Sequence, residues 1–149
     1  MGYYNDLDMT NKVLRTHADG KKWLHTGDLG TVGKDGIVRV SGRMRRMIIV
    51  SENAKIYPTA IENEISQISG VREVALCAVP KENGFFDMIC FVVPEKTENS
   101  EAVRREVEEF CVMRYPEDTR PKKYNIVSEF PLTKVGKIDY LALEKVAED

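Results

Sequence analysis

The spacing of apolar residues changes partway along the chain. The opening segment scatters its apolar positions among Gly, Asn, Asp and Lys, and it predicts no more than a short helix. Residues 23–43 combine short apolar stretches with glycines, and the turn dipeptide Asp35-Gly36 divides them into the two antiparallel strands of a β-hairpin. Three arginines within residues 43–46 form a polar joint before the apolar run at residues 47–50, which predicts a buried strand. We expect the domain boundary at this joint.

Beyond the joint, the pattern predicts helices mixed with strands. Isoleucines follow Pro58 at helical spacing, and Gly70 is placed to end that helix. Residues 74–79 and 88–93 are continuous apolar runs of strand length, so we expect them to pair in one sheet. The remainder predicts a helix from Ser100 to about Pro116, a strand over residues 124–130, a loop over residues 131–137 and a short final helix.

The predicted fold class is α+β. An N-terminal β-hairpin segment is followed by a small domain with a mainly antiparallel sheet of about three strands, helices packed on it and a short hairpin. The 149 residues are 42% hydrophobic and 31% charged, which suffices for one ordinary core and is short for two complete domains.

Composition also limits the partners. With 22 Lys+Arg and 24 Asp+Glu, the formal net charge is −2, which excludes the strong basic field of a dedicated nucleic-acid binder. No stretch approaches the roughly 20 apolar residues of a membrane span, and the first residues lack the basic segment and the apolar segment of a signal peptide. We therefore expect a cytoplasmic location. Three widely spaced cysteines in apolar surroundings predict buried free thiols, and the two histidines do not complete a zinc site, so no metal site is expected.

Three short segments are unusual. Residues 26–28 and 133–137 place a charged residue next to a glycine, and residues 43–46 contain three arginines. Glycine lets a backbone approach a ligand closely, and a lysine on such a loop suits a phosphate or carboxylate. Taken singly, each segment also has an ordinary explanation, as a turn, a solvated face or a loop tip. The last segment is not a Walker P-loop, because no glycine lies five residues before Gly136 and Ile138 follows the lysine.

In order and spacing, the motifs resemble the C-terminal part of the adenylate-forming enzymes, the superfamily of AMP-forming acyl-CoA synthetases, peptide-synthetase adenylation domains and beetle luciferase. Five motifs carry the resemblance: Gly2-Tyr3-Tyr4-Asn5, Trp23-Leu24-His25-Thr26-Gly27-Asp28-Leu29, Ser41-Gly42-Arg43, Ile56-Tyr57-Pro58 with Ile61-Glu62, and Pro131-Leu132-Thr133 through Gly136-Lys137. The Ser/Thr/Gly-rich phosphate-binding loop is not among them. The resemblance implies that residues 1–43 end a large N-terminal adenylate-forming domain, residues 44–46 are a hinge, and residues 47–149 form a small mobile C-terminal domain.

The resemblance assigns roles to single residues. Asp28 falls on the carboxylate that binds both ribose hydroxyls of ATP or AMP, and Arg43 on the arginine that contacts ribose and phosphate. Arg45 falls on the hinge about which the small domain rotates between an adenylating and a thioesterifying pose. Lys137 falls on the lysine that reaches the acyl carboxylate and the α-phosphate during adenylation, and it is the implied catalytic residue.

The chain departs from the family in the implied thiol-acceptor loop, Ser51-Glu52-Asn53. The family usually has a Gly-Gly or Gly-His pair that lets pantetheine pass, whereas this chain has Glu52-Asn53, which adds bulk and negative charge near a polyanionic CoA. Two other departures are Phe85-Phe86, which we expect to pack in a core or a domain interface, and Asp139-Tyr140 in place of an arginine-rich ending.

The implied function is an ATP-dependent, AMP-forming carboxylate–CoA ligase that forms an acyl-adenylate and then a thioester. The full-length enzyme is expected to use ATP, Mg²⁺ and CoA with a small-molecule carboxylic acid, whereas the chain without the large domain should bind none of them tightly and be inactive. One alternative is an adenylating enzyme that loads a carrier-protein phosphopantetheine, which Glu52 would favour. Another is a non-catalytic regulatory module of the same fold, which the presence of both Asp28 and Lys137 disfavours.

Overall fold

The chain forms two compact units, Met1–Arg45 and Arg46–Asp149. The computed structural model describes residues 2–96 and 99–148, and Met1, residues 97–98 and Asp149 lie outside this description. The division between the units falls within the three residues that the resemblance identifies as a hinge. Each unit is described by itself.

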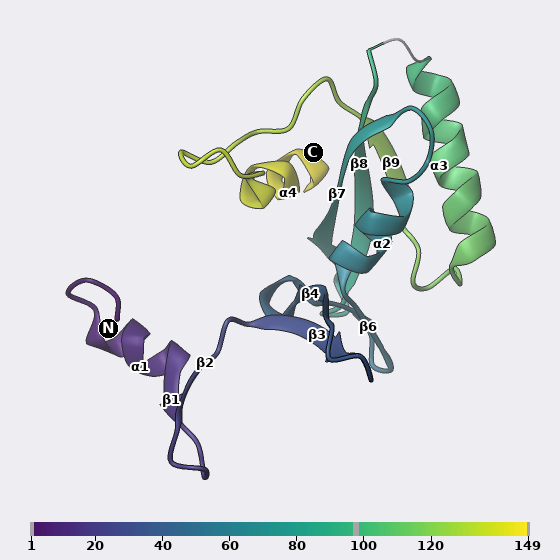
Figure 1. The fold of residues 1–149 in the computed structure, drawn as a ribbon. Coiled ribbons are helices and arrows are strands. Elements are labelled where there is room, and N and C mark those ends of the chain that lie inside the picture. Colours follow the sequence, from purple (N-terminus) through teal and green to yellow (C-terminus); the bar gives the residue numbers. More distant parts are fainter. Residues whose placement is uncertain (1, 97–98, 149) are drawn as a thin grey trace. The chain divides into compact units, whose positions relative to one another are not determined.

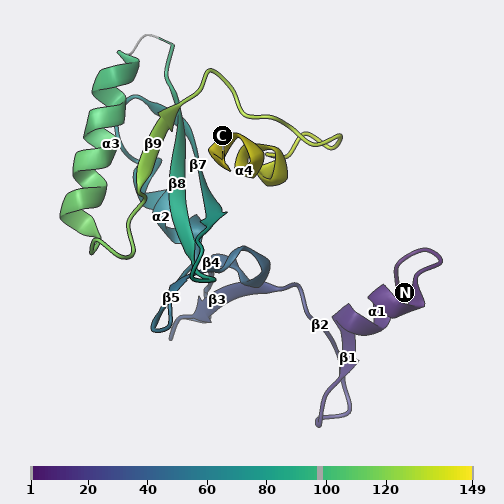
Figure 2. The same ribbon diagram turned by 180° about the vertical axis from the view of Figure 1, so that it is seen from behind.

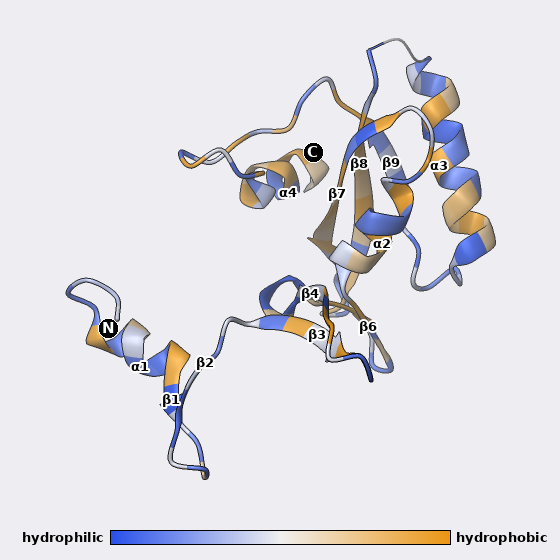
Figure 3. Cartoon of the chain, viewed as in Figure 1, coloured by the Kyte–Doolittle hydropathy of each residue, from blue (hydrophilic) through white to orange (hydrophobic). Residues whose placement is uncertain are grey.

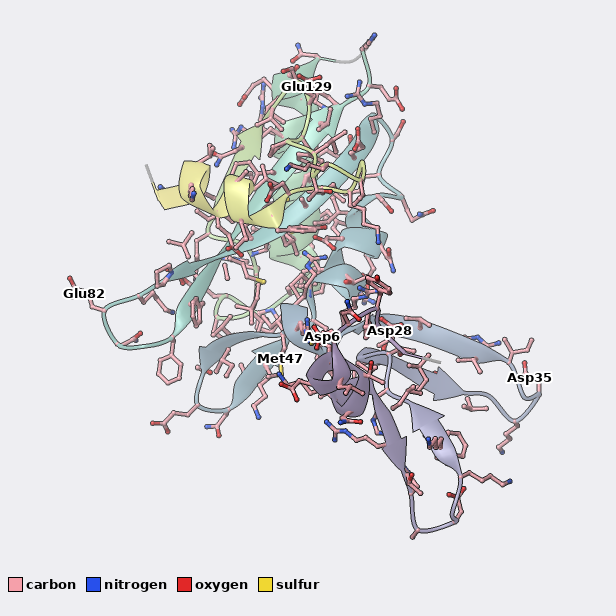
Figure 4. All side chains as sticks on the ribbon, turned by 90° about the vertical axis from the view of Figure 1, so that its left-hand side faces the viewer. Asp6, Asp28, Asp35, Met47, Glu82 and Glu129 are labelled. Carbon is pink, nitrogen blue, oxygen red and sulfur yellow. The ribbon has the colours of Figure 1, made fainter. Side chains whose placement is uncertain are left out.

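The first unit pairs its strands in two hairpins. Its elements are the helix α1 (Leu7–Val13) and the strands β1 (Leu14–Thr16), β2 (Lys22–Leu24), β3 (Asp28–Val32) and β4 (Val38–Arg43). The antiparallel β3–β4 pair confirms the predicted hairpin, and Figure 4 shows Asp35 at its tip. Trp23, which the prediction placed with this hairpin, instead pairs with Arg15 in an antiparallel β1–β2 hairpin. The sequence pattern does not predict this earlier hairpin, because each of its strands is only three residues long.

The second unit is built on a three-stranded sheet in the order β7-β8-β9. Its strands β7 and β8 are antiparallel, and β9 runs parallel to β8. Figures 1 and 2 show α2 and α3 on one side of this sheet and α4 on the other. The elements in order are η1 (Met44–Arg46), which leads into the unit, then β5 (Ile48–Ser51), β6 (Ala54–Ile56), α2 (Pro58–Ile65), β7 (Val71–Pro80), β8 (Phe86–Pro94), α3 (Ser100–Arg114), β9 (Lys123–Ile126) and α4 (Tyr140–Glu148).

Both faces of this sheet are buried, which explains why β7 and β8 are continuously apolar in the sequence. Alternate strand residues enter two different clusters, since successive side chains of a strand point to opposite faces. Figure 3, coloured by residue hydropathy, shows β7 and β8 as mainly apolar and α3 as alternating between polar and apolar residues. One cluster, facing α2 and α3, includes Ile65, Leu76, Cys90, Val92 and Val107, and the other, facing α4, includes Ala75, Cys77, Phe91, Val93 and Leu143.

Several predicted elements differ in their ends. The helix α2 stops at Ile65, and Ile68 lies in the turn that precedes Gly70, whose φ is +82°. The strand β9 ends at Ile126, so the predicted strand over residues 124–130 is too long, although Phe130 is buried. Of the paired phenylalanines, Phe86 packs against the first cluster as expected. All three cysteines are buried and free, as predicted.

Candidate active site

Asp28 and Arg43 lie opposite each other on the β3–β4 hairpin. They are partners in the strand register, and the Nε of Arg43 lies 2.8 Å from the Oδ1 of Asp28. The Asp28 side chain is 30% exposed and the Arg43 side chain 65% exposed. A carboxylate accepts more than one hydrogen bond, so Asp28 can hold Arg43 and still accept from a ligand hydroxyl. The structure thus brings together the two residues that the resemblance assigns to a nucleotide.

The Thr-Gly-Asp turn fixes the start of the strand that carries Asp28. Gly27 has φ +78°, in the left-handed region that favours glycine. The hydroxyl oxygen of Thr26 accepts from the Asp28 N–H at 3.1 Å, and the Gly27 carbonyl accepts from the Met44 N–H at 2.9 Å. The carboxylate therefore projects from a hydrogen-bonded hairpin end, which Figure 4 labels at Asp28.

Arg45 is the middle residue of the 3-10 turn η1. Its side chain is exposed, and the boundary between the two compact units follows it directly. A hinge requires an exposed residue at such a place, where a change of φ and ψ disrupts no core packing. Rotation about Arg45 stays a prediction.

The segment assigned to the thiol acceptor is the tip of the β5–β6 hairpin. Glu52 and Asn53 are exposed and form the turn between the register partners Ser51 and Ala54. Two-residue hairpin turns usually have a positive φ at one or both central positions. Among the described non-glycine residues, however, only Asn5 has a positive φ. The Glu52 carboxylate is thus displayed on a turn that does not use the usual left-handed geometry.

Lys137 closes a tight, exposed loop. The Thr133 N–H donates to the Lys137 carbonyl at 2.7 Å, and the Lys137 N–H donates to the Thr133 hydroxyl at 3.2 Å. Gly136 has φ +75°, and its N–H donates to the Thr133 carbonyl at 2.9 Å. Leu132 and Ile138 form an antiparallel bridge below these contacts. The backbone of Lys137 is therefore anchored, while its ammonium group is free to reach a ligand.

Nothing in the described part of the chain favours a metal centre or a membrane span. No group of three or more His, Cys, Asp and Glu side chains there could hold a metal ion. His17 and His25 approach to 2.8 Å between their Nε2 atoms, as an exposed pair. Burial raises the pKa of the Cys77 thiol to about 12, so it remains neutral at physiological pH. No helix in the described ranges is long and apolar enough to cross a membrane.

Comparison with known families places these features in context. The profile of the AMP-binding enzyme C-terminal domain matches residues 60–137, just over half of the chain. The chain belongs to this family. The match runs from α2 to Lys137, so it includes the core sheet and the lysine loop.

Relatives of this AMP-binding C-terminal domain are much longer proteins. The long-chain-fatty-acid–CoA ligase of Salmonella typhimurium is 34% identical over 141 residues, which cover 93% of this chain and 23% of that enzyme. The 2-succinylbenzoate–CoA ligase of Oceanobacillus iheyensis is 30% identical over 137 residues, covering 92% and 26%. The chain therefore spans about a quarter of the length of these relatives.

Solved structures share the fold. ATP-bound MatB from Rhodopseudomonas palustris has a TM-score of 0.72 and 27% identity, covering 99% of this chain and 28% of that one. The amide bond synthetase McbA from Marinactinospora thermotolerans has a TM-score of 0.75 and 26% identity, covering 98% and 28%. These similarities confirm the α+β fold and the resemblance to adenylate-forming enzymes.

One cluster in this AMP-binding C-terminal domain is not predicted by the sequence. The Arg46 guanidinium donates to both carboxylate oxygens of Glu62, from Nη1 at 2.9 Å and from Nη2 at 2.7 Å. The same Nη2 donates to the Leu76 carbonyl at 3.1 Å, and the Leu76 N–H donates to Glu62 at 2.8 Å. Because β7 is an edge strand, these two side chains satisfy backbone groups that no neighbouring strand meets.

This cluster is largely buried and includes an aromatic ring. Glu62 is 7% exposed, and the Cζ of Arg46 lies 3.8 Å from the centroid of the Tyr140 ring. Burial alone would lower the pKa of Arg46, but the hydrogen bonds and charge of Glu62 outweigh it, so the pKa is raised. Burial raises the pKa of Tyr140 to about 12. Removing one partner of such a buried pair costs about 3–5 kcal/mol of stability.

From the sequence alone, Arg46 is expected to be part of the polar joint at residues 43–46. The signal that could have separated it from the other arginines is Glu62, a carboxylate on the apolar face of a helix beside Ile61 and Ile65. A buried carboxylate needs a cationic or hydrogen-bonding partner. Of the arginines at residues 43–46, only Arg46 lies within the second unit.

Proposed function

We propose that the chain is the C-terminal part of an ATP-dependent, AMP-forming carboxylate–CoA ligase. The observation that carries the proposal is the anchored Thr133–Lys137 loop, which presents an exposed lysine at the end of a matched AMP-binding C-terminal domain. The Asp28–Arg43 pair supports the same proposal, because it offers a carboxylate and a cation to a ribose and a phosphate.

In the first half-reaction, a carboxylate oxygen of the acid attacks the α-phosphorus of ATP. A carboxylate oxygen–phosphorus bond forms, and the bond from the α-phosphorus to the pyrophosphate oxygen breaks, which gives the acyl-adenylate and pyrophosphate. Lys137 holds the acid and the α-phosphate together and offsets the negative charge that develops during transfer. Loss of such a preorganised donor costs about 3–4 kcal/mol. Mg²⁺ would bind with ATP and offset the charge of its phosphates, and no group of three or more His, Cys, Asp and Glu side chains among the described residues could hold the ion.

In the second half-reaction, the sulfur of a thiol attacks the acyl carbon and its proton is released to water. A carbon–sulfur bond forms, and AMP leaves with the electron pair of the broken carbon–oxygen bond. We assign the change of pose to Arg45 and the contact with the incoming thiol to the tip at residues 51–53. The exposed position of Arg45 between the two units supports this assignment, and so does the exposed β5–β6 turn. Lys137 has no role in this step.

A second candidate differs in the acceptor. Glu52 places a negative charge on the exposed tip. This charge would repel the phosphates of free CoA, whereas the pantetheine arm of a carrier protein has no nucleotide phosphates to repel. The named relatives and neighbours include CoA ligases and an amide bond synthetase, so this fold serves more than one acceptor. Comparing CoA with pantetheine, which lacks the nucleotide phosphates, distinguishes the candidates.

The test is carboxylate-dependent exchange of pyrophosphate into ATP by the enzyme that contains this chain. Long-chain fatty acids are the first substrates to try, since the 34% identical Salmonella relative is named for them. We expect exchange in that enzyme and none in the 149-residue chain, which contributes only a few contacts to the nucleotide. Robust exchange by the 149-residue chain would overturn the proposal, and so would an enzyme that activates no acid in a broad panel.

A further inference from the structure

The buried Arg46 cluster connects the residue after the hinge to three other elements. Arg46 ends the turn η1, Glu62 lies on α2, Leu76 on β7 and Tyr140 at the start of α4. The hydrogen bonds to Glu62 and Leu76 hold the guanidinium in one plane. The Tyr140 ring is stacked at 3.8 Å from the guanidinium carbon. Arg46, the first residue of the second unit, is thus fixed to the core of that unit directly after the hinge residue Arg45.

The same ring lies three residues beyond Lys137, and the intervening chain has little freedom. Ile138 is bridged to Leu132, and the Asp139 N–H donates to the Pro131 carbonyl at 2.8 Å. The Asp139 carboxylate accepts from the Ala142 N–H at 3.2 Å, as a cap on the first turn of α4. Any displacement of Tyr140 is therefore transmitted to the base of the lysine loop.

We infer that Arg46 is a positioning residue that holds the hinge exit and the lysine loop as one rigid piece. The contact between the Arg46 guanidinium and the Tyr140 ring connects the hinge to the lysine loop. The two hydrogen bonds to Glu62 fix the orientation of that guanidinium. A rotation about Arg45 then carries Lys137 with it, because the loop cannot absorb the movement. The geometric part stands on these contacts alone, and its consequence for catalysis rests on the proposed function.

The geometric part is tested by amide hydrogen exchange, followed by NMR, on the 149-residue chain. Tyr140→Leu removes the ring and leaves the Arg46–Glu62 fork in place. We expect the hydrogen-bonded amides of Thr133, Gly136 and Asp139 to exchange about tenfold faster, the equivalent of losing one desolvated cation–π contact. Arg46→Met should accelerate the exchange of the same amides at least as much. Tyr140→Phe, which keeps the aromatic ring, should show the slow exchange of the unaltered chain.

A matched control is Arg114→Met, which breaks the 2.9 Å ion pair with Glu64 on the same helix α2 and touches no part of the cluster. Because the Arg114–Glu64 pair is exposed, its loss should change the exchange rates of the lysine-loop amides by less than twofold. The amide of Phe91 in β8 monitors global opening. The inference is overturned if Tyr140→Leu leaves the loop amides unchanged, or accelerates them only as much as Phe91.

The catalytic consequence is tested in the enzyme that contains this chain. Tyr140→Leu should lower kcat for adenylation about tenfold with little change in KM for ATP, while thioester formation from a supplied acyl-adenylate is preserved. Equal losses in both half-reactions would contradict positioning of Lys137. If the unaltered enzyme adenylates no acid, the proposed function fails, and the exchange experiment still decides the role of Arg46.

Discussion

The two units of the chain differ in how their apolar residues are used. In the first unit, Gly42 is the only buried residue among those described, and ten large apolar side chains are exposed: Tyr3, Tyr4, Leu7, Trp23, Leu24, Val32, Ile37, Val38, Val40 and Met44. In the second unit, two clusters enclose a sheet, and Ile65, Phe91 and Val107 are fully buried. Backbone hydrogen bonds and exposed side-chain contacts therefore organise the first unit, whereas core packing stabilises the second.

The candidate chemistry follows the same division. Asp28 and Arg43 project from a hairpin that has no core of its own, and their exposed pair is held by strand register. Lys137 projects from a loop that leads into α4, whose Leu143 is 2% exposed in the second cluster. Lys137 is thus positioned by a loop next to a packed helix, whereas the Asp28–Arg43 pair rests on the register of an exposed hairpin.

The largest effect is expected from Lys137→Ala in the enzyme that contains this chain. Adenylation should fall by ~10²–10³-fold, because a preorganised donor to the α-phosphate and the acyl carboxylate is lost. Lys134→Ala, in the same exposed loop, is the control and should have little effect. Pyrophosphate exchange measures this step. A comparable loss in both variants would mean that the charge of the loop matters and no single lysine does.

The contrast in packing is tested by one deletion in each unit. Ile65→Ala should lower the free energy of unfolding by about 2–5 kcal/mol, because Ile65 is 0% exposed. Val40→Ala should change it by no more than about 0.5 kcal/mol, because Val40 is 63% exposed. Denaturant unfolding of the 149-residue chain measures both. Equal destabilisation would show that the first unit shares the core of the second.

Substitution of the hinge should have a smaller and more selective effect. Proline at residue 45 fixes φ near −65°, which matches a 3-10 turn and should hold the observed backbone at this point. We expect Arg45→Pro to slow thioester formation by on the order of tenfold and to leave adenylation largely intact. Arg45→Ala, which retains backbone freedom, is the control. If Arg45→Ala is as slow as Arg45→Pro, the side chain matters and the rotation does not.

The smallest effect is expected at the exposed turn. Glu52→Gly should leave adenylation unchanged and, with free CoA, leave thioester formation unchanged or raise it by a few-fold at most, since one exposed charge is removed. Pantetheine, which lacks the nucleotide phosphates, should show no such gain. Measuring thioester formation with both thiols checks this. A loss of adenylation in Glu52→Gly would mean that the turn is only a part of the fold.

The sequence predicts the second unit better than the first for a physical reason. Strands β7 and β8 and helix α3 are long and strongly patterned, because each is buried against a core. The β1–β2 hairpin has three-residue strands without a buried face, so it leaves no periodic signal. The parallel pairing of β9 depends on contacts between segments far apart in sequence, which local pattern does not reveal.

The candidate site shows the same limit. The resemblance of five motifs to the family indicated Asp28, Arg43 and Lys137, because the order and spacing of those motifs can be read directly from the sequence. Arg46 gave no such signal, since its role depends on Glu62 and Tyr140, which are distant in sequence. Motifs indicate candidate site residues on exposed segments, whereas buried contacts such as those of Arg46 become visible only in the folded chain.

The proposed function assigns the two half-reactions to different residues, Lys137 for adenylation and the hinge residue Arg45 for thioester formation. Its most direct test is the ratio of adenylation to thioester formation, measured in single turnovers for Lys137→Ala and Arg45→Pro in the enzyme that contains this chain. The account predicts opposite shifts: the ratio falls in Lys137→Ala and rises in Arg45→Pro. If both variants shift the ratio in the same direction, or leave it unchanged while both rates fall, the two-pose account is contradicted.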